Sequence, residues 1–148
     1  MRPTLALCLA LPLVALGCGS TPVGLEADLP GSTWTVERVV TGTGEVLRGE
    51  GQVTFGSSGS LSVSSCNVCN GTYAVSGDRL EVAEPLACTR RRCGPGELEL
   101  EDFFAGLLAL RRDGLYLVVE PDPLAGGPQV LLLPAPGASP RGAASGAR

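Results

Sequence analysis

The sequence contains no histidine, no lysine and no isoleucine, and only 4% of its residues are aromatic. Without histidine or lysine, the serines between Ser57 and Ser65 have no base that could activate a hydroxyl, which argues against nucleophilic catalysis. All 11 basic residues are arginines and the formal charge is −4, so the chain offers no general attraction to nucleic acid. We therefore expect a protein that is not an enzyme and that does not bind nucleic acid.

Glycine and proline are frequent, with 21 and 12 residues respectively, which favours turns and short strands over long helices. The length of 148 residues fits a single domain. Hydrophobic residues make up 44% of the chain, which is ample for one core. These values are typical of a small, mainly β protein.

The N-terminus reads as an export signal over residues 1–17, because Arg2 precedes an apolar run that is too short to span a membrane stably. The segment Ala15–Cys18 resembles the lipobox of bacterial lipoproteins, in which the cysteine becomes the lipidated first residue. Leu16 lies two positions before Cys18, whereas the lipobox prefers leucine three positions before it. Gly19 stands where aspartate would indicate retention in the inner membrane. We expect a lipid anchor in the outer membrane, facing the periplasm; the alternative is an ordinary signal with a chance cysteine.

Composition divides the rest of the chain into three parts. Residues 18–30 are small and polar enough to form a flexible tether. Residues 134–148 are rich in proline, glycine, alanine and serine without apolar periodicity, and we expect them to be disordered. The folded domain is therefore predicted over residues 31–133.

Alternating apolar and polar residues, separated by glycine-containing turns, predict an antiparallel meander. The predicted strands cover residues 33–38, 45–48, 52–55, 61–63, 71–75, 80–82, 115–120 and 130–133. One helix is predicted over residues 100–108, where apolar residues recur at helical spacing: Leu100, Phe103, Phe104, Leu107 and Leu108. Its end is ambiguous, because residues 108–111 could instead enter a hairpin that turns at Asp113 and Gly114.

Four cysteines lie in two pairs at the two ends of a predicted hairpin: Cys66, Cys69, Cys88 and Cys93. A nested pairing of Cys66 with Cys93 and of Cys69 with Cys88 suits a hairpin whose ends meet, although four cysteines allow three connectivities. The spacing could also hold tetrahedral zinc. Redox exchange through Cys66-x-x-Cys69 is a further alternative, but it requires a helix behind the first cysteine where a strand is predicted. Export favours structural disulfides, because exported cysteines usually oxidise.

The pattern that begins with Cys66 and Asn67 and continues with Gly71 and Tyr73 resembles the motif of the META-domain family, also called HslJ-like. In that family a Thr-Arg-x-x-Cys element follows, and the segment Thr89–Cys93 matches it. The matching positions are Trp34, Cys66, Asn67, Gly71, Tyr73, Thr89, Arg90 and Cys93. The chain departs from the commonest pattern by adding Cys69 and Cys88, which look like the two halves of an extra cross-link. The resemblance covers residues 31–133.

The motif residues also have plain structural interpretations. Asn67 is expected to cap backbone groups at a strand end. Gly71 is expected to allow a close approach or a bulge, and Tyr73 to pack in the core. The cluster of arginines at 90–92 is interpreted as a solvated loop, although it could grip a phosphate or a carboxylate.

The resemblance implies a mainly β (α+β) fold, a small and strongly curved antiparallel sheet or partial barrel with one α-helix. It further implies an envelope lipoprotein linked to heat induction, envelope stress or novobiocin resistance. We expect no cofactor and no bound metal. Our leading hypothesis is a binding or assembly module that engages an envelope protein, a peptide or a lipid chain through its concave sheet or helix edge. The alternatives are a stress-protective structural lipoprotein without a ligand and a thiol-redox or zinc-binding protein.

Overall fold

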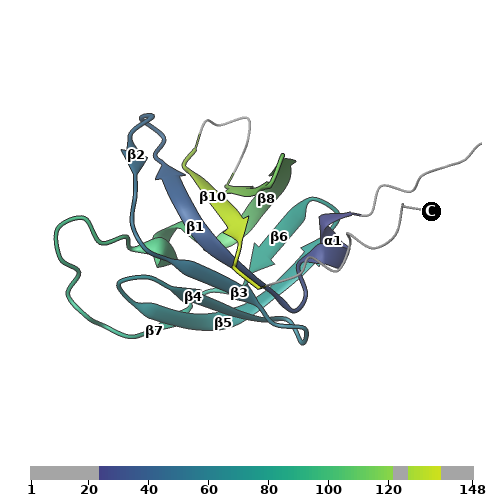
Figure 1. Ribbon diagram of the computed structural model, residues 1–148. Coiled ribbons are helices and arrows are strands. Elements are labelled where there is room, and N and C mark those ends of the chain that lie inside the picture. Colours follow the sequence, from purple (N-terminus) through teal and green to yellow (C-terminus); the bar gives the residue numbers. More distant parts are fainter. Residues whose placement is uncertain (1–23, 122–126, 138–148) are drawn as a thin grey trace, which may run out of the picture.

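The structure, a computed structural model, describes residues 24–121 and 127–137 as a β-barrel with two short helical segments (Figure 1). The strands are β1 (Ser32–Val40), β2 (Val46–Leu47), β3 (Gln52–Phe55), β4 (Ser60–Ser64), β5 (Val68–Ser76), β6 (Arg79–Val82), β7 (Ala87–Cys88), β8 (Gly106–Asp113), β9 (Tyr116–Glu120) and β10 (Gln129–Pro134). The helical segments are α1 (Leu25–Asp28) and the 3-10 turn η1 (Leu100–Phe103). The predicted class, a mainly β fold built on a curved antiparallel sheet, is confirmed, and each of the predicted strands has a counterpart.

The sheet closes on itself because β1 pairs on both of its edges. Eight strands follow one another around the barrel in the order β1, β3, β4, β5, β6, β8, β9 and β10, and β10 pairs with β1. The nine-residue β1 carries a bulge between Val36 and Arg38, which bends the strand so that it can turn around the barrel. Strands β2 and β7 pair with the outer ends of β1 and β5.

Side chains fill the barrel interior. Along β3, β4 and β6 every second residue is buried, as expected for strands with one face toward the core. An eight-stranded barrel is just wide enough for its inward side chains to meet. The largest fully buried side chains are Phe55, Phe104, Leu29, Leu61, Leu80, Leu100, Leu108, Leu117 and Leu132. The concave face of the sheet is therefore the hydrophobic core, and it is not the open binding face that the sequence suggested.

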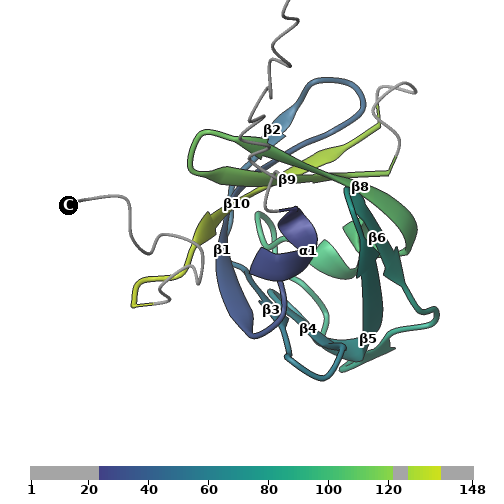
Figure 2. The same cartoon turned by 90° about the vertical axis from the view of Figure 1, so that its right-hand side faces the viewer.

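The two helical segments lie at opposite ends of the barrel (Figures 1 and 2). Figure 2 looks into the mouth covered by α1. Leu29, the residue that follows α1, is fully buried. At the other end, η1 contributes Leu100 to the core, and Phe104 follows it. Both mouths are thus closed by apolar side chains that come from short connecting segments.

The helix predicted over residues 100–108 is wrong beyond Phe103. The turn η1 ends at Phe103, and Gly106, which has a left-handed φ of +67°, begins β8. In β8, Leu108 and Leu110 are buried in the core, whereas Leu107 is 57% exposed. Strand β8 pairs with β6 on one edge and with β9 on the other. A helix in its place would leave the facing edges of β6 and β9 without hydrogen-bond partners. The alternative hairpin with its turn at Gly114 is the observed one.

The predicted boundaries of the folded domain are also shifted. Helix α1 and the buried Leu29 lie inside residues 18–30, the predicted tether, so the fold begins by Leu25. At the other end, β10 continues to Pro134, and the Ala135 N–H donates to the Thr33 carbonyl. The predicted signal, Cys18 and most of the predicted tail lie outside the described residues. Among those that are described, no helix has the length and apolar character to cross a membrane.

Candidate functional site

Two disulfides fasten the loops at one end of the barrel, in the nested pairing considered above. Cys69 lies directly opposite Cys88 where β5 pairs with β7, and their Cα atoms are 4.0 Å apart. Cys66 is bonded to Cys93, with 5.6 Å between the Cα atoms. In the chain-entropy model, each bridge closes a loop whose restriction stabilises the fold by about 3 to 4 kcal/mol. The pairing favours structural staples over zinc, and the described residues hold no cluster of three candidate metal ligands.

Asn67 connects three segments that are far apart in sequence. Its side-chain Oδ1 accepts hydrogen bonds from the Arg91 N–H at 2.8 Å and from the Thr89 hydroxyl at 3.3 Å. Its Nδ2 donates to Glu101 Oε1 at 2.9 Å. The residue is only 8% exposed, so these partners replace water that it cannot reach. Asn67 therefore caps backbone groups as expected, and it also fastens η1 to the cystine-bonded loops.

Glu101 has one carboxylate oxygen with a partner and one without. Oε2 is buried and makes no hydrogen bond, although Oε1 accepts from Asn67. Glu101 lines a hollow of about 280 Å³ together with Leu86, Phe104 and Glu84.

Arg91 is the member of the arginine cluster that is built into the fold. Its Nε donates to the Cys66 carbonyl at 3.1 Å, and its guanidinium pairs with Glu97. The pKa of Glu97 lies below its usual value, mainly because the Gly94 N–H donates to its carboxylate and secondly because the Arg91 guanidinium donates to it. Arg90 and Arg92 are exposed, as the solvated-loop interpretation predicts.

Gly71 and Tyr73 have packing roles. A Cβ on Gly71 would lie 2.4 Å from Leu86 Cδ2, so the glycine gives Leu86 room to cover β5. The Tyr73 ring meets Phe55 edge-on with 5.1 Å between centroids, and its hydroxyl donates to the Gly56 carbonyl at 3.0 Å. Burial raises the pKa of Tyr73. Both residues agree with the close approach and core packing expected from sequence.

Trp34, the early tryptophan of the motif, fixes the opposite mouth. It is 3% exposed, and its Nε1 donates to Ser32 Oγ at 2.7 Å. The Arg112 guanidinium lies 4.9 Å from the ring centroid and also bonds Asp28 of α1 at 2.9 Å. Arg112 thus ties α1 to the barrel wall, a role that no sequence pattern indicated.

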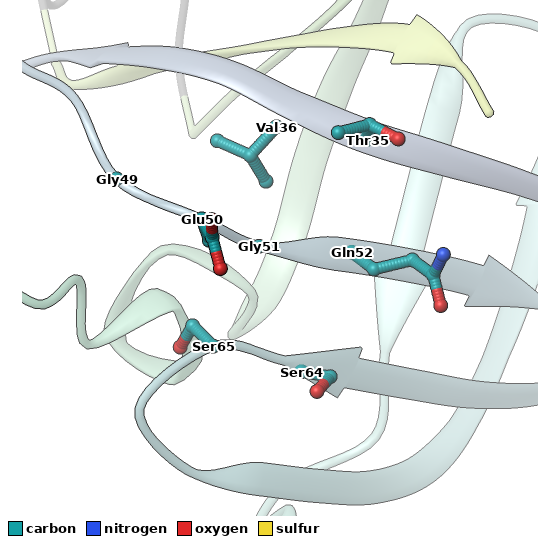
Figure 3. A pocket seen from close by; sticks show the side chains of 8 residues that line it. All are labelled: Thr35, Val36, Gly49, Glu50, Gly51, Gln52, Ser64 and Ser65. Atoms are coloured by element: carbon teal, nitrogen blue, oxygen red, sulfur yellow. The ribbon is translucent and has the colours of Figure 1, made fainter. Parts of the chain in front are cut away.

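A surface groove runs between β1, β3 and the cystine-bonded loops. One hollow of about 520 Å³ is lined by polar side chains such as Thr35, Gln52 and Ser64, and Figure 3 shows Glu50 pointing from the chain before β3 toward Ser65. Glu50 and Ser65 also line a second hollow of about 410 Å³. The two hollows therefore adjoin and form one polar groove, which we call the Glu50 groove.

Sequence reasoning missed the Glu50 groove, although the pattern held a signal. Two glycines flank Glu50 where a strand begins, and glycine inside a strand pattern often marks a close approach. A Cβ at Gly51 would lie 2.4 Å from Leu100 Cδ1, and one at Gly49 would lie 2.8 Å from Leu98 Cγ. The two glycines therefore let this segment lie close to Leu98 and Leu100, and Glu50 between them is exposed.

The fold and the site thus define a closed antiparallel barrel with one disulfide-bonded end, at which Asn67 and the cysteines of the motif lie. The chain belongs to the META domain family, whose model matches residues 27–114. The NMR structure of a protein from Burkholderia xenovorans is similar, with a TM-score of 0.57 and 17% identity over 72% of this chain and 83% of that one. That likeness concerns the fold alone. No curated protein matches the chain.

Proposed function

We propose that the protein is an exported lipoprotein, anchored to the outer membrane of a bacterial envelope through Cys18. The observation that supports this most strongly is the pairing of all four cysteines of the barrel in disulfides. Such bonds persist in oxidising compartments and are rare in the cytosol. The apolar N-terminal segment and the lipobox-like residues before Cys18 point the same way.

Within that setting the barrel is a non-enzymatic binding or assembly module. Its interior is occupied by its own side chains, so a ligand would lie on the outside. The Glu50 groove is lined by a carboxylate, an amide and several hydroxyls, which suits the backbone and polar side chains of an extended peptide or a protein loop.

Lipidation is tested by mass spectrometry of the N-terminal peptide of protein extracted from membranes. We expect a diacylated or triacylated Cys18, and a Cys18→Ser variant that is found in the soluble fraction. A mature N-terminus elsewhere, or Cys18 with a free thiol in membrane-extracted protein, would contradict the proposal.

Binding in the groove is tested by placing a photo-reactive amino acid at Gln52 in cells. The matched control is Glu81, which is exposed on β6, three strands around the barrel from β3. We expect one adduct of defined mass from Gln52 that disappears when Glu50→Arg is added, and no such adduct from Glu81. Identical adducts from both positions would mean that the groove has no special role.

The filled core also favours a second candidate, a stress-protective structural lipoprotein that needs no ligand. In that case Glu50→Arg would leave survival unchanged under heat or novobiocin, while deletion of the whole protein would lower it. A thiol-redox role is the third candidate. It predicts free thiols in the purified exported protein, whereas paired cysteines predict none.

A further inference from the structure

We propose that the mouth covered by α1 faces the membrane and that the turn between β8 and β9 touches the lipid surface. This inference rests on the proposed lipidation of Cys18. It adds an orientation, which leaves the Glu50 groove and the disulfide-bonded loops facing away from the bilayer.

The length of chain between Cys18 and the fold limits how the barrel can lie. The described structure begins at Gly24, six positions after Cys18, and six extended residues span about 20 Å at most. Strand β8 alone, with eight residues, is about 25 Å long. Because strands in a barrel tilt by about 35–45°, β8 rises roughly 20 Å along the barrel axis, so only a fully extended anchor could reach the opposite mouth. Any shorter path keeps the α1 mouth next to the bilayer.

The point at which the anchor leaves the barrel is itself fixed. Leu29 is fully buried below α1, and Asp28 bonds Arg112 on β8 at 2.9 Å. The carboxylate of Glu26 accepts from the N–H of Gly77 in the turn between β5 and β6 at 3.1 Å. Helix α1 is thus bound to two walls of the barrel (Figure 2). A lipid anchor attached before α1 therefore sets the orientation of the whole barrel.

The rim of this mouth carries the most exposed large apolar side chain among the described residues. Leu115 is 75% exposed, in the turn between β8 and β9. This turn lies beside α1, because Arg112, three residues earlier, reaches both Trp34 and Asp28. A leucine at a turn next to a lipid anchor is placed to enter the interface between headgroups and acyl chains.

Ion pairs on the rim reduce its repulsion from anionic headgroups. Asp113 lies 3.4 Å from the Arg111 guanidinium, and Asp78 lies 3.9 Å from that of Arg79. The carboxylate of Asp28 is matched in the same way by Arg112. Since each of these carboxylates has an arginine beside it, a negatively charged surface can approach the rim.

The test compares two exposed leucines on the same hairpin. Leu115 lies beside α1, whereas Leu107, which is 57% exposed, lies near the opposite end of β8. Lipidated L115W and L107W variants are bound to phosphatidylcholine vesicles with brominated or ordinary acyl chains, and tryptophan fluorescence is compared. The native Trp34 is 3% exposed and gives the same background in both variants.

We expect bromine to quench L115W at least about twofold more strongly than L107W. Equal quenching, stronger quenching of L107W, or no quenching of either variant would overturn the orientation if the acylated protein floats with the vesicles. If L115W is not quenched, the exposed leucine on the rim is instead a contact site for a protein partner. Protein that carries no acyl chain and does not float would overturn the lipoprotein proposal itself, which flotation and mass reveal separately.

Discussion

The side chain of Asn67 gives the sharpest test of how the motif works. Asn67→Ala removes the acceptor for the Arg91 N–H and the donor to Glu101 Oε1. Leaving a buried partner unsatisfied costs about 1–3 kcal/mol. Because Arg91 is partly open to water, we expect a total loss of about 2–4 kcal/mol in the free energy of unfolding.

The assay is guanidinium unfolding of the oxidised protein, followed by the fluorescence of the single tryptophan. The matched control is Asn70→Ala, because Asn70 is an exposed asparagine on β5, three residues after Asn67. A surface change of this kind stays within about 0.5 kcal/mol. If Asn67→Ala cost no more than Asn70→Ala, the central role of Asn67 would be refuted.

A swap of the polar pair tests the direction of the hydrogen bond. In Asn67→Asp the new carboxylate would face Glu101, and repulsion adds to the lost donor. Glu101→Gln alone keeps an acceptor for Asn67 and should cost less than about 1 kcal/mol. When both substitutions are combined, the new amide at position 101 can donate to the new carboxylate at position 67, so we expect a favourable coupling energy of about 1–3 kcal/mol. Additive losses would show that the two side chains do not interact.

Three further predictions concern residues around the same core. Tyr73→Phe should cost about 1 kcal/mol at neutral pH, and it should weaken the loss of stability that the wild type shows as the pH rises through the raised pKa of Tyr73, followed by phenolate absorbance. Glu97→Gln should flatten the acid side of the pH–stability curve, because the stability linked to the lowered pKa of Glu97 is present above its unfolded pKa and is lost as the pH falls through the folded one. Gly71→Ala should cost about 1–2 kcal/mol by overpacking against Leu86, and adding Leu86→Ala should relieve part of that cost in thermal unfolding.

Much of the barrel could be predicted because its strands show the alternation that a half-buried sheet requires. The helix error arose because Leu100, Phe104 and Leu108 are all buried in the core, yet they reach it from a 3-10 turn and then a strand. Helical spacing alone cannot separate these cases. Gly106, which adopts positive φ inside the predicted helix, was the local signal against it.

The candidate site was only partly predictable for a different reason. The cysteines and Asn67 are recognisable by type and spacing, and the structure places them together as a hairpin would. The partners of Asn67 could not be found in this way, since Glu101 lies 34 positions along the chain. Helix α1 has four residues, too few to show a period, so its cover over the mouth depends on contacts such as Asp28 with Arg112.

We propose an exported barrel fastened by two nested disulfides. Non-reducing peptide mapping of membrane-extracted protein tests it directly. Trypsin cleaves at the arginines of 90–92 but not between Cys66 and Cys69, so nested bonds join three peptides, residues 49–79, 80–90 and 93–111.

Fragmentation between Cys66 and Cys69 then assigns each bond. The account predicts that the Cys66 fragment carries residues 93–111, that the Cys69 fragment carries residues 80–90, and that the N-terminal peptide begins with an acylated Cys18. Four free thiols, or a peptide of residues 49–79 closed on itself, would contradict it.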